Sequence, residues 1–336
     1  MQHSRAGRAE SVTTTDRGGS VGVRPAPTCI LCGSEGTLEH ANLVDRLFGA
    51  PGVWGLRRCS NHRCRLGWSD PQPQPGDIWK LYRGYWTHGA ELNEEPHPNA
   101  EVSGDHKSLV RRVAESVMIW RREAFRSDSR YLTHLPPGRL LDVGCGTGDF
   151  LGGMAELGWQ ATGTDFDEAA VSAARRHKNI KVYSGGLLEQ HFPKDAFDAI
   201  TLSHVIEHVP DPLETFAELK RILAPGGRLV IVTPNVNSLG HKAFGRCWRG
   251  LEPPRHLHLF TDKALKTLAK KVGLNLIACF AAAAAESKIL EVSTDLWKQS
   301  SRSAPPPNAR RLYLQEKLLG WLNVPVGEFL VFLATK

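Results

Sequence analysis

Long apolar runs are missing from this sequence. The longest, residues 276–285, is about half of the roughly 20 residues that a membrane-spanning helix needs, so we expect no transmembrane segment. The first 25 residues also have few large apolar side chains and are rich in Arg, Ser, Thr and Gly. We therefore expect a disordered tail over residues 1–25, no secretory signal, and a cytoplasmic location in which cysteines stay reduced.

A concentrated charge of one sign is missing as well. The chain has 42 Lys and Arg against 35 Asp and Glu, a formal net charge of +7. Small basic groupings occur near residues 57–65 and 111–130, but no basic stripe follows one predicted element. We therefore do not expect a nucleic-acid partner. Internal repeats are not apparent either, and the oligomeric state is left open.

The 336 residues suffice for one large and one small domain. Four of the seven cysteines lie in a predicted module over residues 26–70. A linker over residues 71–107 begins with alternating prolines and continues with Trp79, Tyr82, Tyr85 and Trp86, which are spaced as one face of a short helix. The larger domain is predicted over residues 108–336, beginning with a helical pattern at 108–125 and interrupted by an insertion at about 286–325.

Short strand patterns alternate with helical patterns through the larger domain. One helix should start at Asp211 as its N-cap, with Pro212 in the first helical position. This alternation is typical of βαβ units and of a doubly wound α/β fold with a largely parallel sheet. The predicted strands are residues 139–143, 160–164, 180–183, 197–202, 228–233, 274–280 and 328–334.

A glycine-rich turn follows the first of these strands. It has the spacing G-x-G-x-G, at Gly144, Gly146 and Gly148, and Asp142 lies just before it. The next strand ends near Asp165, where a carboxylate can bind the two hydroxyls of a ribose. Because Asp142 would repel a pyrophosphate but suits an ammonium group, the pattern favours S-adenosylmethionine over a dinucleotide.

Five segments in this order resemble the motifs of class I S-adenosylmethionine-dependent methyltransferases: LLDVGCGTGDF, GTDFD, FDAITLSHVIEHVPDP, LKRILAPGGRLVIVTPN and PRHLHLFT. The resemblance implies methyltransferase activity and a Rossmann-like, seven-stranded, mostly parallel sheet. Its last strand, residues 328–334, should be antiparallel.

The resemblance also implies which residues bind the cofactor. Asp142 would reach the methionine amino group directly or through water, Asp165 would hold the ribose, and Phe166 would flank the adenine. Many relatives have an acidic residue after the third strand, whereas this chain has Ser184-Gly185-Gly186-Leu187, so Leu187 is expected only as an apolar wall. The full set is Asp142, Gly144, Cys145, Gly146, Gly148, Asp165, Phe166, Leu187 and Ser203.

Histidines are the candidate catalytic groups on the acceptor side: His204, His208 and His256. Residues 204–208 also spell the H-x-x-E-H string of some zinc peptidases, but a strand precedes them and Pro210 prevents a long helix. The segment further resembles the E-x-x-E-H metal site of some quinone O-methyltransferases, with His204 in place of the first Glu and His256 completing the set.

A loop at Arg255, His256 and His258 is expected over the acceptor. Only one of the two histidines can face it, since alternate residues of an extended segment point to opposite sides. Arg255 could pair with an acceptor phosphate or carboxylate, or form a surface salt bridge. For His208, His256 and His258 the alternative is a histidine that only packs and forms hydrogen bonds.

The cysteine module is expected to bind structural zinc through Cys29, Cys32, Cys59 and Cys64. Two short-range pairs, C-x2-C and C-x4-C, are separated by 26 residues, which suits tetrahedral coordination by thiolates. Disulfides are the alternative, and His62 could replace one cysteine.

The module and the segment after it resemble the N-terminal part of bacterial methyltransferases that act on small molecules or sugars. We therefore expect methyl transfer from S-adenosylmethionine to a small-molecule or sugar acceptor, most simply at oxygen. Two alternatives stay open. One is a zinc-bearing RNA methyltransferase of the ribosomal guanine type, and the other is an inactive scaffold of the same fold.

Overall fold

The computed structural model describes residues 21–82, 130–283, 288–300, 304–322 and 324–336. The tail expected before residue 26, most of the predicted linker over 71–107, including Tyr85 and Trp86, and the helical pattern at 108–125 lie largely or wholly outside these residues. Those expectations stay predictions for the residues outside these ranges. The predicted end of the disordered tail is wrong, because Val23–Arg24 form a short strand that pairs with Gln72–Pro73.

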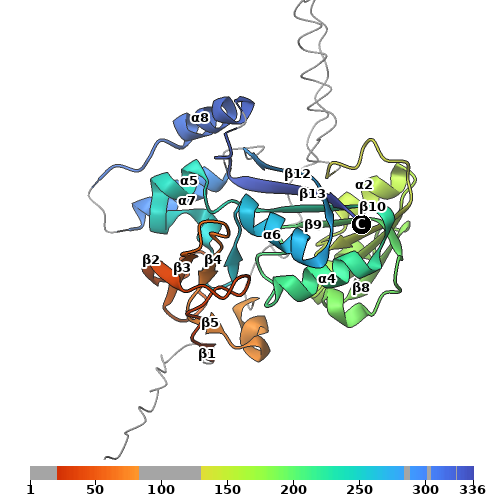
Figure 1. Ribbon diagram of the computed structural model, residues 1–336, viewed down its shortest axis with the longest axis horizontal. Coiled ribbons are helices and arrows are strands. Elements are labelled where there is room, and N and C mark those ends of the chain that lie inside the picture. Colours follow the sequence, from red (N-terminus) through yellow and green to blue (C-terminus); the bar gives the residue numbers. More distant parts are fainter. Residues whose placement is uncertain (1–20, 83–129, 284–287, 301–303, 323) are drawn as a thin grey trace, which may run out of the picture.

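A seven-stranded sheet forms the centre of the molecule (Figure 1). Its strand order is β12-β13-β10-β9-β6-β7-β8, and β13 alone runs antiparallel to both of its neighbours. The predicted mostly parallel sheet with an antiparallel last strand is therefore confirmed. The strands are β6 (Arg139–Val143), β7 (Gln160–Asp165), β8 (Ile180–Ser184), β9 (Phe197–Ser203), β10 (Leu223–Pro234), β12 (Asn275–Ala282) and β13 (Phe329–Thr335).

Helices cover both faces of this sheet because successive strand residues point to opposite sides. Leu141 and Ile200 belong to the core under α4 (Pro212–Ile222) and α6 (Asp262–Val272). Leu140 and Ala199 belong to the core on the other face, under α2 (Asp149–Glu156). Helix α3 (Glu168–Ala174) crosses between β7 and β8. The fold is thus doubly wound, as expected.

The start of α4 shows why local sequence could predict these elements. The Asp211 side chain accepts hydrogen bonds from the backbone N–H groups of Leu213 and Glu214, at 2.9 and 3.0 Å, and Pro212 takes the first helical position. The cap satisfies donors that the first helical turn leaves without partners, so a short polar residue followed by proline marks the start.

A four-stranded sheet carries the cysteine module, in the order β11-β4-β3-β2. Strands β2 (Gly36–Leu43), β3 (Trp54–Cys59) and β4 (Gly67–Ser69) come from the module, whereas β11 (His258–Leu259) comes from the larger domain and pairs antiparallel with β4. Trp68 of β4 and Phe260, next to β11, are buried in the same core. The module therefore lies directly against the larger domain, beside α5 and α7 (Figure 1).

The described start of the predicted linker folds back onto the protein. Strand β5 (Gln72–Pro73) pairs with β1 (Val23–Arg24), and a 3-10 helix, η1, follows over Pro75–Tyr82. The predicted insertion contains α7 (Lys288–Lys298) and α8 (Ala309–Trp321). The remaining elements are α5 (Leu239–Phe244) and the 3-10 turns η3 (Leu187–Gln190), η4 (Gly245–Cys247) and η5 (Arg249–Leu251). Among the described residues, no helix has the length and apolar character to cross a membrane.

Candidate active site

A cavity of about 1480 Å³ opens where β6, β7 and β9 end, lined by Val143, Asp165 and Ser203 at the three strand ends. Ligands of doubly wound sheets bind at this carboxyl edge. The volume exceeds the roughly 300–1,000 Å³ of a common single-ligand pocket, so two reactants can share it. Apolar residues of η1, α7 and β13 form the opposite wall: Ile78, Trp79, Tyr82, Ile289, Val292 and Phe329.

Gly144 and Gly146 of the glycine turn line this cavity, whereas Gly148 is not among the residues that line it. Gly144, Gly146 and Gly148 all have positive φ, at 70°, 55° and 82°. A Cβ on Gly144 would lie 2.4 Å from Cγ2 of Val205, and one on Gly148 would lie 2.9 Å from Cβ of Ala174. Larger residues would therefore close the turn or strain it, and glycine leaves the backbone open to a ligand.

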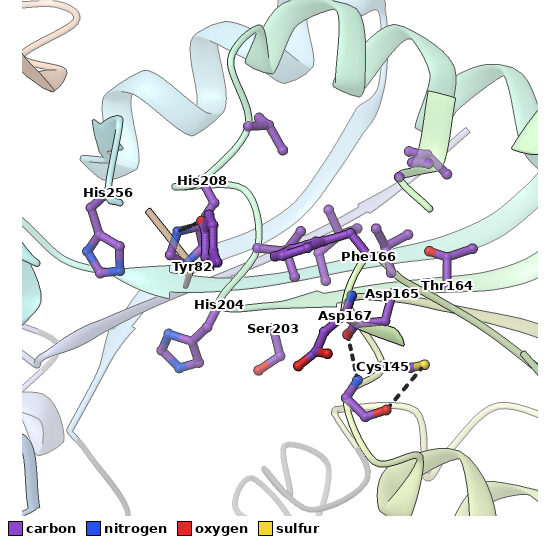
Figure 2. A pocket seen from close by; sticks show the side chains of 18 of the residues that line it. Tyr82, Cys145, Thr164, Asp165, Phe166, Asp167, Ser203, His204, His208 and His256 are labelled. Atoms are coloured by element: carbon purple, nitrogen blue, oxygen red, sulfur yellow. Dashed lines mark hydrogen bonds between the residues drawn. The ribbon is translucent and has the colours of Figure 1, made fainter. Parts of the chain in front are cut away.

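Asp165 connects the turn to the end of β7. Its Oδ2 accepts a hydrogen bond from Gly146 N at 2.9 Å, and its Oδ1 accepts one from Asp167 N at 3.0 Å. Each carboxylate oxygen keeps a second lone pair for a ligand hydroxyl. The next residue, Phe166, also lines the cavity and is 57% exposed, a large value for an aromatic side chain beside a pocket. Figure 2 shows this group opposite the histidines.

Asp142 is not part of the cavity wall. Its side chain is fully buried, and Oδ1 accepts hydrogen bonds from Arg130 and, at 2.7 Å, from Thr201 Oγ1. Burial raises the pKa of Asp142 to about 6, although Arg130 and Thr201 lower it. Arg130 does line the cavity, with its guanidinium 4.0 Å from the centre of the Phe150 ring. Arg130, and not Asp142, therefore lines the cavity beside the glycine turn.

Three further predicted cofactor residues line the cavity: Cys145, Leu187 and Ser203. Cys145 packs below the turn, and burial raises the pKa of its thiol to about 12. Leu187 begins η3 and is buried, as an apolar wall should be. Ser203 ends β9, one residue before the histidine segment.

His204 lies at the edge of the cavity in a left-handed conformation, with φ of 57°. Such a conformation is costly for a residue other than glycine, and it directs the side chain away from the strand. His204 Nδ1 lies 3.3 Å from Glu207 Oε1, and Glu207 Oε2 accepts a hydrogen bond from Thr233 Oγ1 at 3.0 Å. Burial raises the pKa of Glu207, but His204, His208 and His256 lower it to about 2.

His208 is held by two neighbours on one ring nitrogen. Nδ1 lies 3.1 Å from the carbonyl oxygen of Arg255 and 3.0 Å from the Tyr82 hydroxyl. A carbonyl oxygen can only accept, so we assign the proton to Nδ1, which leaves the lone pair on Nε2. Tyr82 also contacts Phe166 edge-on, with ring centres 4.9 Å apart, and Figure 2 shows it beside His208.

His256 lies behind His208, with ring centres 4.8 Å apart. Its Nδ1 donates to the carbonyl oxygen of Gly250 at 2.8 Å, and its Nε2 lies 3.6 Å from Glu252 Oε2. Burial lowers the pKa of His256 to about 4, so the ring is neutral at physiological pH. Ligand atoms of Glu207, His208 and His256 lie within 4.8 Å of one another, which is close enough for one cation.

The two predicted substrate residues do not line the cavity. The guanidinium of Arg255 is fully buried, with Nη2 2.8 Å from Asp45 Oδ2 and Nε 3.0 Å from Glu252 Oε1. Arg255 therefore forms salt bridges, the alternative to acceptor binding, but they are buried and not at the surface, and both carboxylates already neutralise the charge that an acceptor anion would need. His258 is buried in β11, where Nδ1 lies 3.2 Å from the Val209 carbonyl oxygen. Of His256 and His258, only His256 reaches the cavity.

Sequence reasoning missed four residues of this site: Tyr82, Arg130, Glu252 and Asp45. Each forms a hydrogen bond with a predicted site residue but lies outside the motif that contains that residue. The only signal was the aromatic face around Tyr82, for which packing was the simplest explanation.

The four predicted zinc ligands converge away from the cavity. Sγ of Cys29 lies 3.7 Å from Sγ of Cys64, and Sγ of Cys32 lies 3.4 Å from Sγ of Cys59. The four form one group of potential ligands, which does not include His62. For thiolates bound at about 2.3 Å in a tetrahedron, sulfur atoms lie roughly 3.7–3.8 Å apart, so the spacing suits zinc.

Comparison with known proteins finds methyltransferases. Residues 119–278 match the family model described as a methyltransferase domain. Among solved structures, the chain is similar to S-adenosylmethionine-dependent methyltransferases from Archaeoglobus fulgidus and Mesorhizobium loti, each at 20% identity with a TM-score of 0.44. The matches cover 66% and 63% of this chain, and 94% and 98% of those chains.

Curated relatives match a shorter part of the chain. The ubiquinone biosynthesis O-methyltransferase of Alkalilimnicola ehrlichii is 39% identical over 105 residues, which cover 30% of this chain and 42% of the relative. That of Xanthomonas campestris is 40% identical over 108 residues, which cover 30% of this chain and 45% of the relative. The chain thus spans less than half the length of these relatives.

Proposed function

We propose that the protein, whose residues 119–278 match a family model described as a methyltransferase domain, is an S-adenosylmethionine-dependent O-methyltransferase acting on a small molecule with an apolar body. One observation carries the proposal. A single cavity joins the glycine turn and Asp165 at one end to three histidines at the other. It therefore has a place for a methyl donor and a place for a nucleophile.

The residues at the first end fit the cofactor. S-adenosylmethionine, when bound, supplies a methyl group that its sulfonium has already activated. Asp165 has free lone pairs for the ribose hydroxyls, the exposed Phe166 can cover the adenine, and the glycine turn admits a ligand. Arg130 can pair with the methionine carboxylate, and Asp142 then orients Arg130 from below. Asp142 would then position Arg130 and would not contact the methionine amino group itself.

His208 is the group best placed to take a proton from the acceptor. Its Nδ1–H is directed to Arg255 and Tyr82, so the lone pair on Nε2 is available to a hydroxyl. His256 packs behind His208, and His204 lies at the open edge beside Phe329. Methyl transfer is an in-line displacement, so the remaining task of these residues is to hold the acceptor oxygen in line with the donor.

The apolar wall indicates what kind of acceptor fits. Ile78, Trp79, Ile289, Val292 and Phe329 line the same cavity as the histidines, and the Phe329 ring centre lies 4.9 Å from that of His204. Sugar hydroxyls would require polar partners there, whereas an aromatic or aliphatic body needs only contact. A hydroxylated ring compound therefore suits the site better than a sugar or an RNA base. The names of the ubiquinone biosynthesis relatives point in the same direction.

A divalent cation on Glu207, His208 and His256 is a second candidate for activating the acceptor hydroxyl. The observation in its favour is that Oε1 of the buried Glu207 makes no hydrogen bond of regular geometry among the described residues, although His204 Nδ1 lies 3.3 Å away, so this oxygen can turn to an ion. A carboxylate and two neutral imidazoles are suitable ligands for such an ion. In that case these three side chains would hold the ion beside the acceptor hydroxyl. Dependence of the activity on an added divalent ion would distinguish the two mechanisms.

Structural zinc on the four cysteines is also part of the proposal. Its place next to the joint between β4 and β11 gives it a role in holding the module against the catalytic cavity. Thiolates survive best in a reducing compartment, so we place the protein in the cytoplasm.

Transfer of labelled methyl from S-adenosylmethionine tests the function. The wild-type protein, His208→Gln and the control His134→Gln are incubated with cell extract, which is then separated into small-molecule, glycan and RNA fractions. We expect label in apolar small molecules, a loss of about 10²-fold or more in His208→Gln, and no loss in His134→Gln. Label in RNA alone would overturn the acceptor class. No transfer to any fraction would favour the scaffold alternative.

A further inference from the structure

A third group of potential metal ligands lies at the joint between the cysteine module and the larger domain, outside the cavity. Glu39 and His40 belong to β2, and His241 belongs to α5. Nε2 of His40 lies 3.0 Å from Nε2 of His241, and potential ligand atoms of all three residues lie within 4.8 Å of one another. We call these three residues the joint cluster.

His241 presents a lone pair to this cluster. Its Nδ1 lies 2.7 Å from the Val236 carbonyl oxygen, which can only accept a hydrogen bond, so Nδ1 carries the proton and Nε2 is unprotonated. The ring is buried and stacked on Trp248, with ring centres 4.9 Å apart and planes 28° apart. Histidines that bind metals are oriented in this way, through a hydrogen bond from the other ring nitrogen to a carbonyl or carboxylate.

A bulge in β2 brings the carboxylate to the same place. Leu38 pairs with Arg57 and His40 pairs with Leu56, so Glu39 is an extra residue in its strand. Neighbouring residues of a regular strand point to opposite faces, and a bulge changes that direction. Here it allows Glu39 and His40 to converge on the same neighbour, His241.

Arg58 fixes both sides of the joint cluster. Its Nε and Nη2 donate to the two carboxylate oxygens of Glu39 at 2.8 and 3.3 Å, and Nη2 also lies 3.3 Å from the Val236 carbonyl oxygen that holds His241. Each Glu39 oxygen keeps a further lone pair. The arrangement is therefore a set of ligands with an oriented supporting shell, built from two parts of the chain about 200 residues apart.

We propose that Glu39, His40 and His241 form a further metal site, for a divalent transition metal such as Zn²⁺, that connects the cysteine module to the methyltransferase domain. Two nitrogens bound to zinc at about 2.0–2.1 Å lie roughly 2.9–3.4 Å apart at bond angles between about 90° and 110°, so the observed 3.0 Å fits. Glu39 supplies the third ligand, and because Glu39 is exposed, water can complete the shell.

The same distance also fits a hydrogen bond from His40 Nε2–H to His241 Nε2. This hydrogen bond would be present in the protein without the ion. On metal binding His40 gives up that proton, or moves it to Nδ1, and Nε2 becomes a ligand. Bound metal would then hold β2 against α5. Helix α5 contacts α7, which lines the cavity, so the site lies one element away from the acceptor wall.

Cobalt titration of the purified full chain, after removal of bound metal, tests this site. Cobalt on the four cysteines produces thiolate charge-transfer absorption, whereas cobalt on the joint cluster binds without it. We expect His40→Gln and Glu39→Gln each to bind one equivalent less than the wild type, with the charge-transfer band intact. Zn²⁺ should also raise the melting temperature of the wild type further than that of either variant.

His134→Gln is the matched control, because His134 is an exposed histidine outside all three potential metal groups. It should bind as many equivalents as the wild type. Comparing equivalents between variants removes any contribution from Glu207, His208 and His256, and the count does not depend on methyl transfer. The same cobalt stoichiometry in the wild type, His40→Gln and Glu39→Gln would overturn the proposal, as would an equal loss in His134→Gln.

Discussion

Asp165 is the residue on which cofactor binding should depend most. Asp165→Asn keeps the size of the side chain and one of its acceptor oxygens but removes its charge. Charge-assisted hydrogen bonds contribute about 1.5–3 kcal/mol each, so loss of even one should raise the Kd for S-adenosylhomocysteine at least about tenfold. Calorimetric titration measures this change.

The control for that variant is Asp198→Asn. Asp198 is also a carboxylate on a strand of the same sheet, but it pairs with Arg139 outside the cavity, at 2.8 Å. It should leave the Kd unchanged. Equal binding by Asp165→Asn and the wild type would show that the ribose is held elsewhere.

Tyr82 should act as a positioning residue through His208. Tyr82→Phe keeps the ring against Phe166 and removes the hydroxyl 3.0 Å from His208 Nδ1. The loss of one hydrogen bond, about 0.5–1.5 kcal/mol, predicts a fall of roughly 3- to 10-fold in kcat, with little change in KM or in cofactor affinity. Tyr183→Phe, outside the cavity, is the control. A rise in KM with kcat unchanged would assign Tyr82 to acceptor binding instead.

Among single residues, those that belong to one short sequence motif could be predicted from the sequence. The glycine turn and Asp165 lie at the ends of neighbouring strands, so a short pattern is sufficient to place them. The pairs Tyr82–His208 and Arg255–Asp45 join residues 126 and 210 positions apart, and no local pattern contains both partners. Asp142 was predicted to reach the methionine amino group directly or through water. Its hydrogen bond with Arg130 was not predicted, because the local pattern does not include Arg130.

At the scale of elements, α8 is attached to the sheet through an unusual pair of acids. Glu316 of α8 is buried beside Glu328, which precedes β13. Glu328 accepts hydrogen bonds from Gly240 N at 2.9 Å and from Trp248 Nε1 at 2.6 Å. Burial, and then the charge of Glu328, raise the pKa of Glu316 from 4.5 to about 10.

The raised pKa gives a pH dependence with a definite sign. The fold favours the protonated form of Glu316, so this contribution to stability is complete below about pH 4.5 and is lost as the pH rises towards 10. The slope is at most about 1.4 kcal/mol per pH unit. Glu316→Gln is neutral at every pH, so it should melt at a higher temperature than the wild type at pH 8–9 and show a flatter profile.

Thermal melts between pH 5 and 9 measure this difference, with Glu291→Gln as the control. Glu291 lies on the exposed side of α7. Parallel profiles for Glu316→Gln and the wild type would mean that Glu316 ionises normally.

Element prediction succeeded where periodicity extends over several residues. All seven strands of the large sheet overlap their predicted ranges, because each is at least five residues long, although β10 begins five residues before its predicted start. The two-residue strand β11 has no pattern of its own and exists because β4 provides a partner. The linker around Trp79 was expected as a short helix, and its described part forms the 3-10 helix η1.

For the whole molecule, the main consequence of the structure is that the cysteine module and the larger domain share a sheet and a core. Strand β11 pairs with β4, Thr261 Oγ1 donates to the Cys64 carbonyl oxygen at 2.8 Å, and Trp68 and Phe260 are buried in the same core. The prolines after the cysteines predict a domain boundary there, because composition carries no information about these contacts. The two parts should therefore unfold together.

Zinc removal tests this coupling. Purified protein should contain about one zinc per chain on the cysteines, plus any held by the joint cluster, and should melt in one transition. Cys64→Ser should lose the cysteine-bound zinc and lower the temperature of that whole transition, because the core around Cys64 includes residues of the large sheet. Cys279→Ser removes a cysteine outside the cluster and should keep both metal content and cooperativity. Elemental analysis and calorimetry provide the two readouts. A separate low-temperature transition that alone responds to Cys64→Ser would show instead that the module unfolds independently.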